Sequence, residues 1–95
     1  MLTTTPELDE HGILRHRDRW VALSHAEESA MRLLLADLGH VVTRDALHGH
    51  LWPDREAGHR GIDVLMCRLR KHVRPIGLTI ATIRTRGYLL EEVAA

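Results

Sequence analysis

The chain has 95 residues, which is enough for one small domain with a modest hydrophobic core. Its hydrophobic content of 44% and charged content of 27% are typical of a globular protein, and no apolar run approaches the roughly 18 residues of a membrane-spanning helix. One cysteine excludes an internal disulfide, and the first residues lack the regions of a signal peptide, so the sequence predicts a cytoplasmic protein.

The net charge is zero, but the charges are unevenly distributed. Residues 1–51 contain five basic and eight acidic residues, whereas residues 52–88 contain eight basic and three acidic ones. Zero net charge by itself argues against a nucleic-acid partner, because attraction to phosphates needs a positive potential. The basic C-terminal part keeps such a partner open.

The N-terminal segment, residues 1–12, is polar and is expected to be a flexible tail. A single domain is expected over residues 13–93. It begins with a predicted short hairpin at residues 13–24, whose turn falls at residues 17–18.

Two helices are predicted next. Residues 24–40 carry an apolar stripe at helical spacing, and Ser24 with Glu27 fits a capping box, in which each side chain satisfies the other residue's backbone amide. Thr43 is expected to cap a second helix, which ends before Pro53.

The third helix is predicted over residues 60–75. One of its faces is an apolar stripe that is expected to be buried, and the opposite face is basic. The stripe consists of Ile62, Met66, Leu69 and Val73, and the opposite face of Arg60, Val64, Cys67, Arg68 and Lys71.

Residues 78–93 alternate as a β-hairpin does, with a turn at residues 85–87. The predicted fold class is therefore α+β. The order of elements predicts a winged helix-turn-helix, with three helices, a short N-terminal antiparallel sheet and a C-terminal β-hairpin wing.

The sequence resembles the C-terminal effector domains of OmpR/PhoB-type response regulators over residues 13–90. The resemblance rests on segments that follow the family's order and spacing. They are LSHAE (23–27), VVTRDAL (41–47) with Trp52 after it, RGIDVLMCRLR (60–70) and IATIRTRGY (80–88).

Four features depart from the family pattern. The family's N-terminal receiver domain is longer than this chain can include, and its four-stranded N-terminal sheet is expected to be shortened here. Leu65 and Cys67 stand where many members place polar DNA contacts, and Thr85 replaces a glycine at the tip of the wing.

The resemblance implies a DNA-binding transcription regulator and not an enzyme. It places the third helix in the major groove and the wing in the minor groove, on DNA sites arranged as direct repeats. Arg68 is expected to contact guanine, Val64 a thymine methyl group, and Cys67 to pack against the DNA.

The other contacts are expected at the DNA backbone, which positions the protein without reading sequence. We expect phosphate contacts from the third helix, from the N-terminus of the second helix and from the wing tip. The resemblance puts one wing arginine in the minor groove and a wing threonine on the backbone. The phosphate set is Arg60, Arg70, Lys71, Thr43, Arg44 and Arg86; the wing pair is Arg84 and Thr82.

Other interpretations of single residues stay open. Arg60 can pair with Asp63 or Glu56 on the surface. Asp63 is expected to be structural, and Cys67 can act as a redox switch instead of packing on DNA. Three aromatic residues are expected in the core or at its edge: Trp20, Trp52 and Tyr88.

Metal binding and catalysis are not expected, and no cofactor is predicted. The candidate ligands His48, His50, His59, Cys67 and His72 lack the paired spacing of a metal site. His48 and His50 point to different faces of a helix, although a histidine cluster that responds to pH stays open. No motif places a catalytic group.

Two partners besides DNA follow from the resemblance. The loop at residues 53–59 corresponds to the place where family activators touch RNA polymerase, and head-to-tail self-association on DNA is the second. The alternative function is a protein-interaction module of the transcription machinery, whose basic face meets an acidic partner. The missing receiver domain and the apolar Leu65 and Cys67 favour that alternative.

Overall fold

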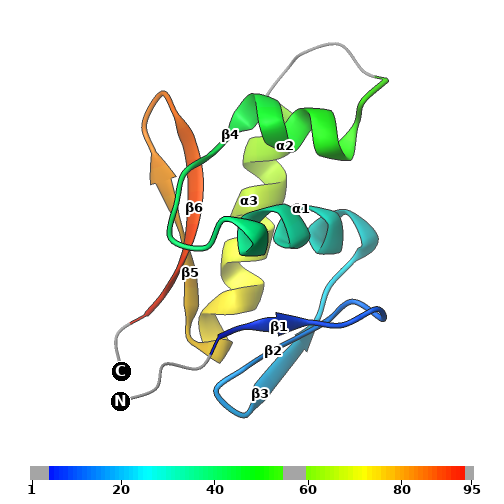
Figure 1. The fold of residues 1–95 in the computed structure, drawn as a ribbon, viewed down its shortest axis with the longest axis vertical. Coiled ribbons are helices and arrows are strands. Elements are labelled where there is room, and N and C mark those ends of the chain that lie inside the picture. The colour runs from blue at the N-terminus through cyan, green and yellow to red at the C-terminus, as the bar shows by residue number, and fades with distance from the viewer. Residues whose placement is uncertain (1–4, 55–59, 94–95) are drawn as a thin grey trace.

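The computed structural model describes residues 5–54 and 60–93. Three short strands come first and form an antiparallel sheet in chain order (Figure 1). They are β1 (Glu7–Leu8), β2 (Ile13–His16) and β3 (Arg19–Ala22).

The sheet starts inside the segment that was expected to be a tail, because β1 pairs with β2. Asp9 orders the connection between these two strands. Its carboxylate accepts hydrogen bonds from the backbone amides of His11 and Ile13, at 2.8 and 3.0 Å, and from Arg15 Nη1 at 2.7 Å. The Arg15 hydrogen bond, followed by that of the Ile13 amide, lowers the pKa of Asp9 to about 2.

The predicted hairpin at residues 13–24 and its turn are confirmed, since Arg17 and Asp18 both have positive φ, at 53° and 63°. The prediction that Trp20 lies in the core or at its edge is wrong, because the residue is 66% exposed. Trp20 pairs with Arg15 across the sheet, and both are exposed, whereas Leu14 is buried in the core. Alternation along β3 therefore places the indole on the outer face of the sheet.

The three predicted helices are present. α1 ends earlier than predicted, and a short 3-10 turn follows α3. The elements are α1 (His25–Ala36), α2 (Arg44–Leu51), α3 (Arg60–Val73) and η1 (Arg74–Ile76).

Both predicted N-caps are confirmed. Ser24 Oγ accepts the amide of Glu27 at 3.3 Å, and Glu27 Oε1 accepts the amide of Ser24 at 2.8 Å, which completes the capping box. Thr43 Oγ1 accepts the amide of Ala46 at 3.0 Å at the start of α2. Each cap satisfies amides that the first turn of a helix leaves without a partner.

The C-terminal hairpin consists of β5 (Leu78–Ile83) and β6 (Gly87–Glu92). A two-residue strand, β4 (Val42–Thr43), pairs with β6 and was not predicted, because two residues are too few to show alternation. The sheet order is β4-β6-β5, so the hairpin joins the segment before α2 to the flank of α3 (Figure 1).

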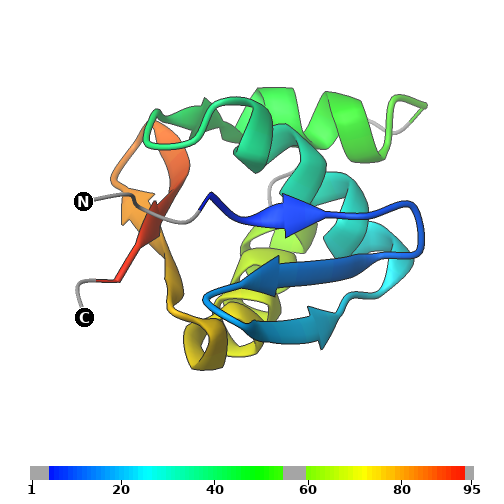
Figure 2. The same ribbon diagram turned by 60° about the horizontal axis from the view of Figure 1, so that its bottom comes forward.

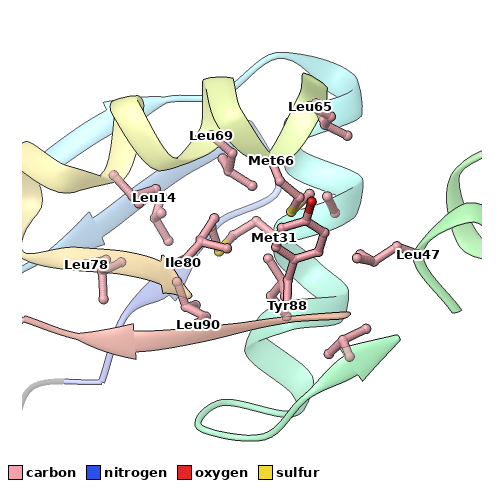
Figure 3. Close-up of a cluster of buried hydrophobic side chains, with 14 of the residues drawn as sticks. Leu14, Met31, Leu47, Leu65, Met66, Leu69, Leu78, Ile80, Tyr88 and Leu90 are labelled. Carbon is pink, nitrogen blue, oxygen red and sulfur yellow. The ribbon is translucent and has the colours of Figure 1, made fainter. Parts of the chain in front are cut away.

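The predicted stripe of α3 is confirmed as fully buried, at Ile62, Met66, Leu69 and Val73. Leu65 is buried too, at 8% exposure, so the apolar face of α3 is wider than predicted. Figure 3 shows this face against Ile80, Tyr88 and Leu90 of the hairpin and Met31 of α1. The core thus lies between α1, α3 and the hairpin.

Figure 2 shows the N-terminal sheet beside the end of α3, where η1 follows. Three side chains of the β2–β3 hairpin hold the sheet in this place. Buried His16 lies with Nδ1 2.6 Å from the Ile76 carbonyl oxygen and Nε2 3.0 Å from Glu92 Oε1. Arg17 donates to the Val93 carbonyl at 2.6 Å, and Arg19 to the Pro75 carbonyl at 2.9 Å. These contacts hold the sheet against η1 and β6.

The turn of the wing has an uncommon residue for its conformation. Arg86 donates its amide to the Ile83 carbonyl at 3.0 Å, and Thr85 has a positive φ of 63°. A positive φ at the third residue of a β-turn is usually met by glycine, because a β-branched side chain is strained there. The Thr85 hydroxyl donates to the Arg84 carbonyl at 2.6 Å, which offsets part of the strain.

We expect Gly87→Ala to lower the free energy of unfolding by roughly 2–4 kcal/mol, measured by urea denaturation. A Cβ on Gly87 would lie 2.1 Å from the Val42 carbonyl oxygen, so β4 would have to move. Gly49→Ala is the matched control, because nothing lies within 4 Å of that position on α2. It should raise stability by about 1 kcal/mol through helix propensity. Equal effects of the two changes would contradict the close approach.

We expect Thr85→Gly to raise the free energy of unfolding by about 1 kcal/mol, because the left-handed conformation costs glycine nothing. The control is Arg86→Gly in the same turn, where φ is not positive and added chain entropy should lower stability by roughly 0.5–1 kcal/mol. The same denaturation experiment measures both, and a loss of stability in Thr85→Gly would contradict strain at this residue.

Candidate nucleic-acid interface

The face of α3 opposite the core is confirmed as exposed. Val64 is 47% exposed although it is apolar, and the basic residues of the predicted face are exposed beside it. Leu65 does not belong to this face, because it packs into the core. The exposed face consists of Arg60, Val64, Cys67, Arg68 and Lys71.

Several basic groups of α3 and the wing have no internal partner. Within residues 5–54 and 60–93, they take part in no hydrogen bond or ion pair. Their charge is therefore available to an anionic ligand, and α3 and the wing flank each other so that both can face the same one (Figure 1). These groups are Arg60, Arg68, Lys71, Arg84 and Arg86.

Arg44 is held by a different arrangement. Its Nε donates to Asp63 Oδ1 at 3.0 Å, and its guanidinium carbon lies 5.3 Å from the centre of the Tyr88 ring. The Tyr88 hydroxyl donates to the same Asp63 oxygen. One carboxylate thus joins the start of α2, the first turn of α3 and β6, which fits the structural role expected for Asp63.

The electrostatics of this cluster favour its hydrogen bonds. The hydrogen bond to Asp63 raises the pKa of Arg44 above its already high value. Burial, with the Asp63 carboxylate adding to it, raises the pKa of Tyr88, so its hydroxyl stays protonated and can donate near neutral pH.

Arg70 also binds within the protein. Its Nε donates to the Ile80 carbonyl oxygen at 2.8 Å, and its Nη2 donates to Thr82 Oγ1 at 2.7 Å. Both acceptors lie on β5. The sequence predicts DNA backbone contacts for Arg70 and Thr82, and in the structure these two residues are hydrogen-bonded to each other.

An open groove of about 550 Å³ lies between the start of α2 and the tip of the wing. Thr43, the N-cap of α2, and Arg86 of the wing tip both line the groove. A helix N-terminus and a guanidinium that line one groove favour a phosphate group electrostatically. The lining residues are Val41, Thr43, Arg44, Asp45, Thr85 and Arg86.

A second groove, of about 450 Å³, runs along α3 beside Trp52, which is half-buried as predicted. Trp52 stands edge-on to His48, with ring centres 5.7 Å apart, and its ring covers Gly61, where a Cβ would lie 3.1 Å from it. Val64 and Arg68 line the groove as well. The small residue at position 61 thus lets the indole pack on the helix next to the exposed face, a role that the sequence did not reveal.

The histidines do not gather into a metal site in the described part of the chain, where no group of three or more His, Cys, Asp or Glu is placed to hold an ion. His48 packs against Trp52, and His72 Nδ1 lies 2.6 Å from the buried Glu27 Oε2. His59 and residues 55–58 of the proposed polymerase-binding loop lie outside the described residues.

None of the described helices has the length and apolar character to cross a membrane.

The sequence carries only weak signals for the hydrogen bonds that Arg44 and Arg70 make within the protein. Asp63 and Arg70 are seven residues apart, two helical turns, which places them on one side of α3. Nothing in the sequence says that this side faces the hairpin.

Comparison with known proteins gives one consistent result. Residues 17–90 match the family described as "Transcriptional regulatory protein, C terminal". The chain is 39% identical over 77 residues to the transcriptional regulatory protein PhoP of Escherichia coli K12, and 40% identical over 75 residues to the virulence transcriptional regulatory protein PhoP of Salmonella typhimurium. These matches cover 78% and 75% of this chain but only 34% and 33% of the relatives.

Solved structures agree. The C-terminal domain of the nisin resistance regulator NsrR is 36% identical, with a TM-score of 0.78 and 90% of each chain covered. The RstA DNA-binding domain of Klebsiella pneumoniae, solved in complex with the RstA box, is 26% identical, with a TM-score of 0.76 and 96% and 95% of the two chains covered. The chain belongs to the transcriptional regulatory protein C-terminal family, the non-enzymatic winged-helix DNA-binding domains of the OmpR/PhoB type.

Proposed function

We propose that this domain binds double-stranded DNA in a sequence-specific manner, with α3 in the major groove and the β5–β6 wing in the minor groove. The observation that carries the proposal is the set of unpaired basic groups that α3 and the wing share. A guanidinium or ammonium group without an internal partner can neutralise a phosphate without first breaking a bond within the protein.

In the major groove, Arg68 contacts guanine and Val64 contacts a thymine methyl group, with Cys67 packed beside them. All three side chains lie on the exposed face of α3. The burial of Leu65 supports this reading over a protein-interaction module, because only Cys67 of the two apolar residues that favoured such a module is on the surface.

The contacts with the DNA backbone lie on both sides of the exposed face of α3. Arg60 and Lys71 hold phosphates from α3. Thr43, Arg44 and Arg86 hold one from the groove between α2 and the wing tip. In this arrangement Asp63 orients Arg44, since it occupies only the Nε of the guanidinium.

Arg84 enters the minor groove, where a narrow width concentrates negative potential. Binding to two direct repeats would place two copies head to tail along the DNA. The loop at residues 53–59, of which Pro53 and Asp54 are described, would then offer a surface to RNA polymerase.

The first test is a salt titration of binding to a duplex selected from random DNA. Affinity should fall steeply with salt, through release of counterions. Arg84→Ala should lower the slope of log K against log salt by about 0.9. Arg32→Ala is the control, because Arg32 is paired with Glu28 on α1, at 2.6 Å, and the slope should not change.

Arg68→Ala should instead cost about 1–3 kcal/mol of discrimination at one base pair, because a bidentate guanidinium–guanine contact is lost. Competition between the selected duplex and its single-base variants measures this loss. Binding that does not depend on salt, together with capture of an acidic protein, would support the interaction module and overturn the proposal.

The selected DNA itself gives a further test. We expect two copies of one motif in the same orientation, with centres about 10–10.5 base pairs apart, since the second protein must meet the same face of the duplex. Sequencing the bound pool shows the arrangement. Inverted repeats or isolated single sites would contradict head-to-tail binding.

A further inference from the structure

One cross-strand pair of the wing is held from both sides by α3. Thr82 on β5 and Tyr88 on β6 are direct partners in the hairpin. Thr82 accepts a hydrogen bond from Arg70, and Tyr88 donates one to Asp63. The two hydrogen bonds therefore hold both members of one cross-strand pair, Thr82 and Tyr88, which we call the held rung of the hairpin.

Asp63 and Arg70, the two residues of α3 that make these hydrogen bonds, are aligned along the helix. Asp63 and Arg70 lie two turns apart, so they project from the same side of α3. Val64 and Arg68 project from the neighbouring side, which is exposed. A fixed angle around one helix thus separates the groups that hold the wing from the groups proposed to read DNA.

The hydrogen bonds of Arg70 are suited to fixing the position of β5 against α3. Its guanidinium makes two hydrogen bonds to β5 through two different nitrogens, and the planar group fixes the direction of both. A phosphate contact by Arg70 would have to share or break these bonds. The guanidinium groups of Arg84 and Arg86, by contrast, are exposed and have no partner within the described residues.

The held rung is close to the residue proposed for the minor groove. Arg84 follows Thr82 by two residues, and the turn begins after Ile83. Any change in the angle between the hairpin and α3 at the rung displaces Arg84 relative to Arg68. The rung is the last full pair before the pair of Ile83 with Gly87 that closes the hairpin.

We propose that Arg70 and Thr82 are positioning residues, which hold the wing so that Arg84 reaches the minor groove while α3 reads the major groove, and that they do not contact phosphates themselves. This inference rests on the proposed DNA-binding function. The contacts of Arg70 with β5 and of Asp63 with Tyr88, here called the clamp, then couple the wing to α3.

A double-mutant cycle with Arg84 tests the inference. Arg70→Ala should lower affinity for the selected duplex about tenfold in the unaltered chain, but less than about twofold when Arg84 is already alanine. A positioning residue has nothing left to position once Arg84 is removed. A residue that neutralises its own phosphate would lose the same factor in both backgrounds.

The salt slope gives an independent reading of the same variants. In the Arg84→Ala background, Arg70→Ala should leave the slope unchanged. A direct phosphate contact would lower the slope by about 0.9 there. A residue needed only for stability would move the unfolding midpoint and would show no coupling to Arg84 in binding.

Thr82→Val is the milder variant, since it removes the hydroxyl acceptor but keeps the shape and the bond from Arg70 to the Ile80 carbonyl. It should lower affinity about threefold in the unaltered chain and not at all in Arg84→Ala. This variant keeps the test valid if Arg70→Ala does not fold. Arg74→Ala is the matched control for loss of one exposed arginine near the end of α3, and it should change affinity less than about twofold in either background.

The outcomes separate the two proposals. If the unaltered chain shows no salt-dependent binding to any selected duplex, the proposed function fails. If it binds but the effects of the Arg70 and Arg84 changes add, the positioning role is overturned and DNA binding stands. If Arg84→Ala has no effect on binding, the wing is not a reader, and the positioning role is overturned as well.

Discussion

A two-stranded hairpin is at best marginally stable in water, so the β5–β6 wing depends on the body of the domain for its position. The structure supplies three kinds of contact. Ile80, Tyr88 and Leu90 pack against α1 and α3, the backbone of Gly87 approaches β4 closely, and two side chains of α3 hold one rung by hydrogen bonds. The apolar contacts supply most of the stability, whereas the directional polar contacts fix the angle.

That angle matters because the two elements proposed to read DNA belong to different parts of the fold, a helix and a hairpin. α3 and the wing turn are joined only through η1 and β5. Their relative placement must reach hydrogen-bond precision if both are to meet one duplex. Asp63 and Arg70 connect them directly, so the placement does not rely on the intervening chain.

Much of the fold was predictable from local signals. The Ser24–Glu27 capping box, the Thr43 cap and the stripe of α3 each rest on interactions between residues that are close in sequence, and all three predictions are confirmed. The start of the sheet at β1 and the strand β4 were missed, since each has two residues and depends on a distant partner.

The candidate site was predictable only in part. The sequence shows that α3 has a basic face, but it does not show which arginines already have partners. Arg44 and Arg70 look like Arg60 and Arg68 in the sequence and differ only in what lies opposite them. The burial prediction for Trp20 was wrong for a related reason. A hydrophobic residue is expected to be buried, but the sequence does not show that one face of its strand is uncovered.

The division of labour around α3 has an evolutionary consequence. Val64, Cys67 and Arg68 contribute little to the core, so exchanging them changes stability little, whereas the buried stripe and the clamp residues tolerate no such freedom. Under the proposed function, a duplicated copy of this domain can therefore acquire a new DNA preference through a few substitutions on one helical face. The scaffold that presents that face would be inherited intact.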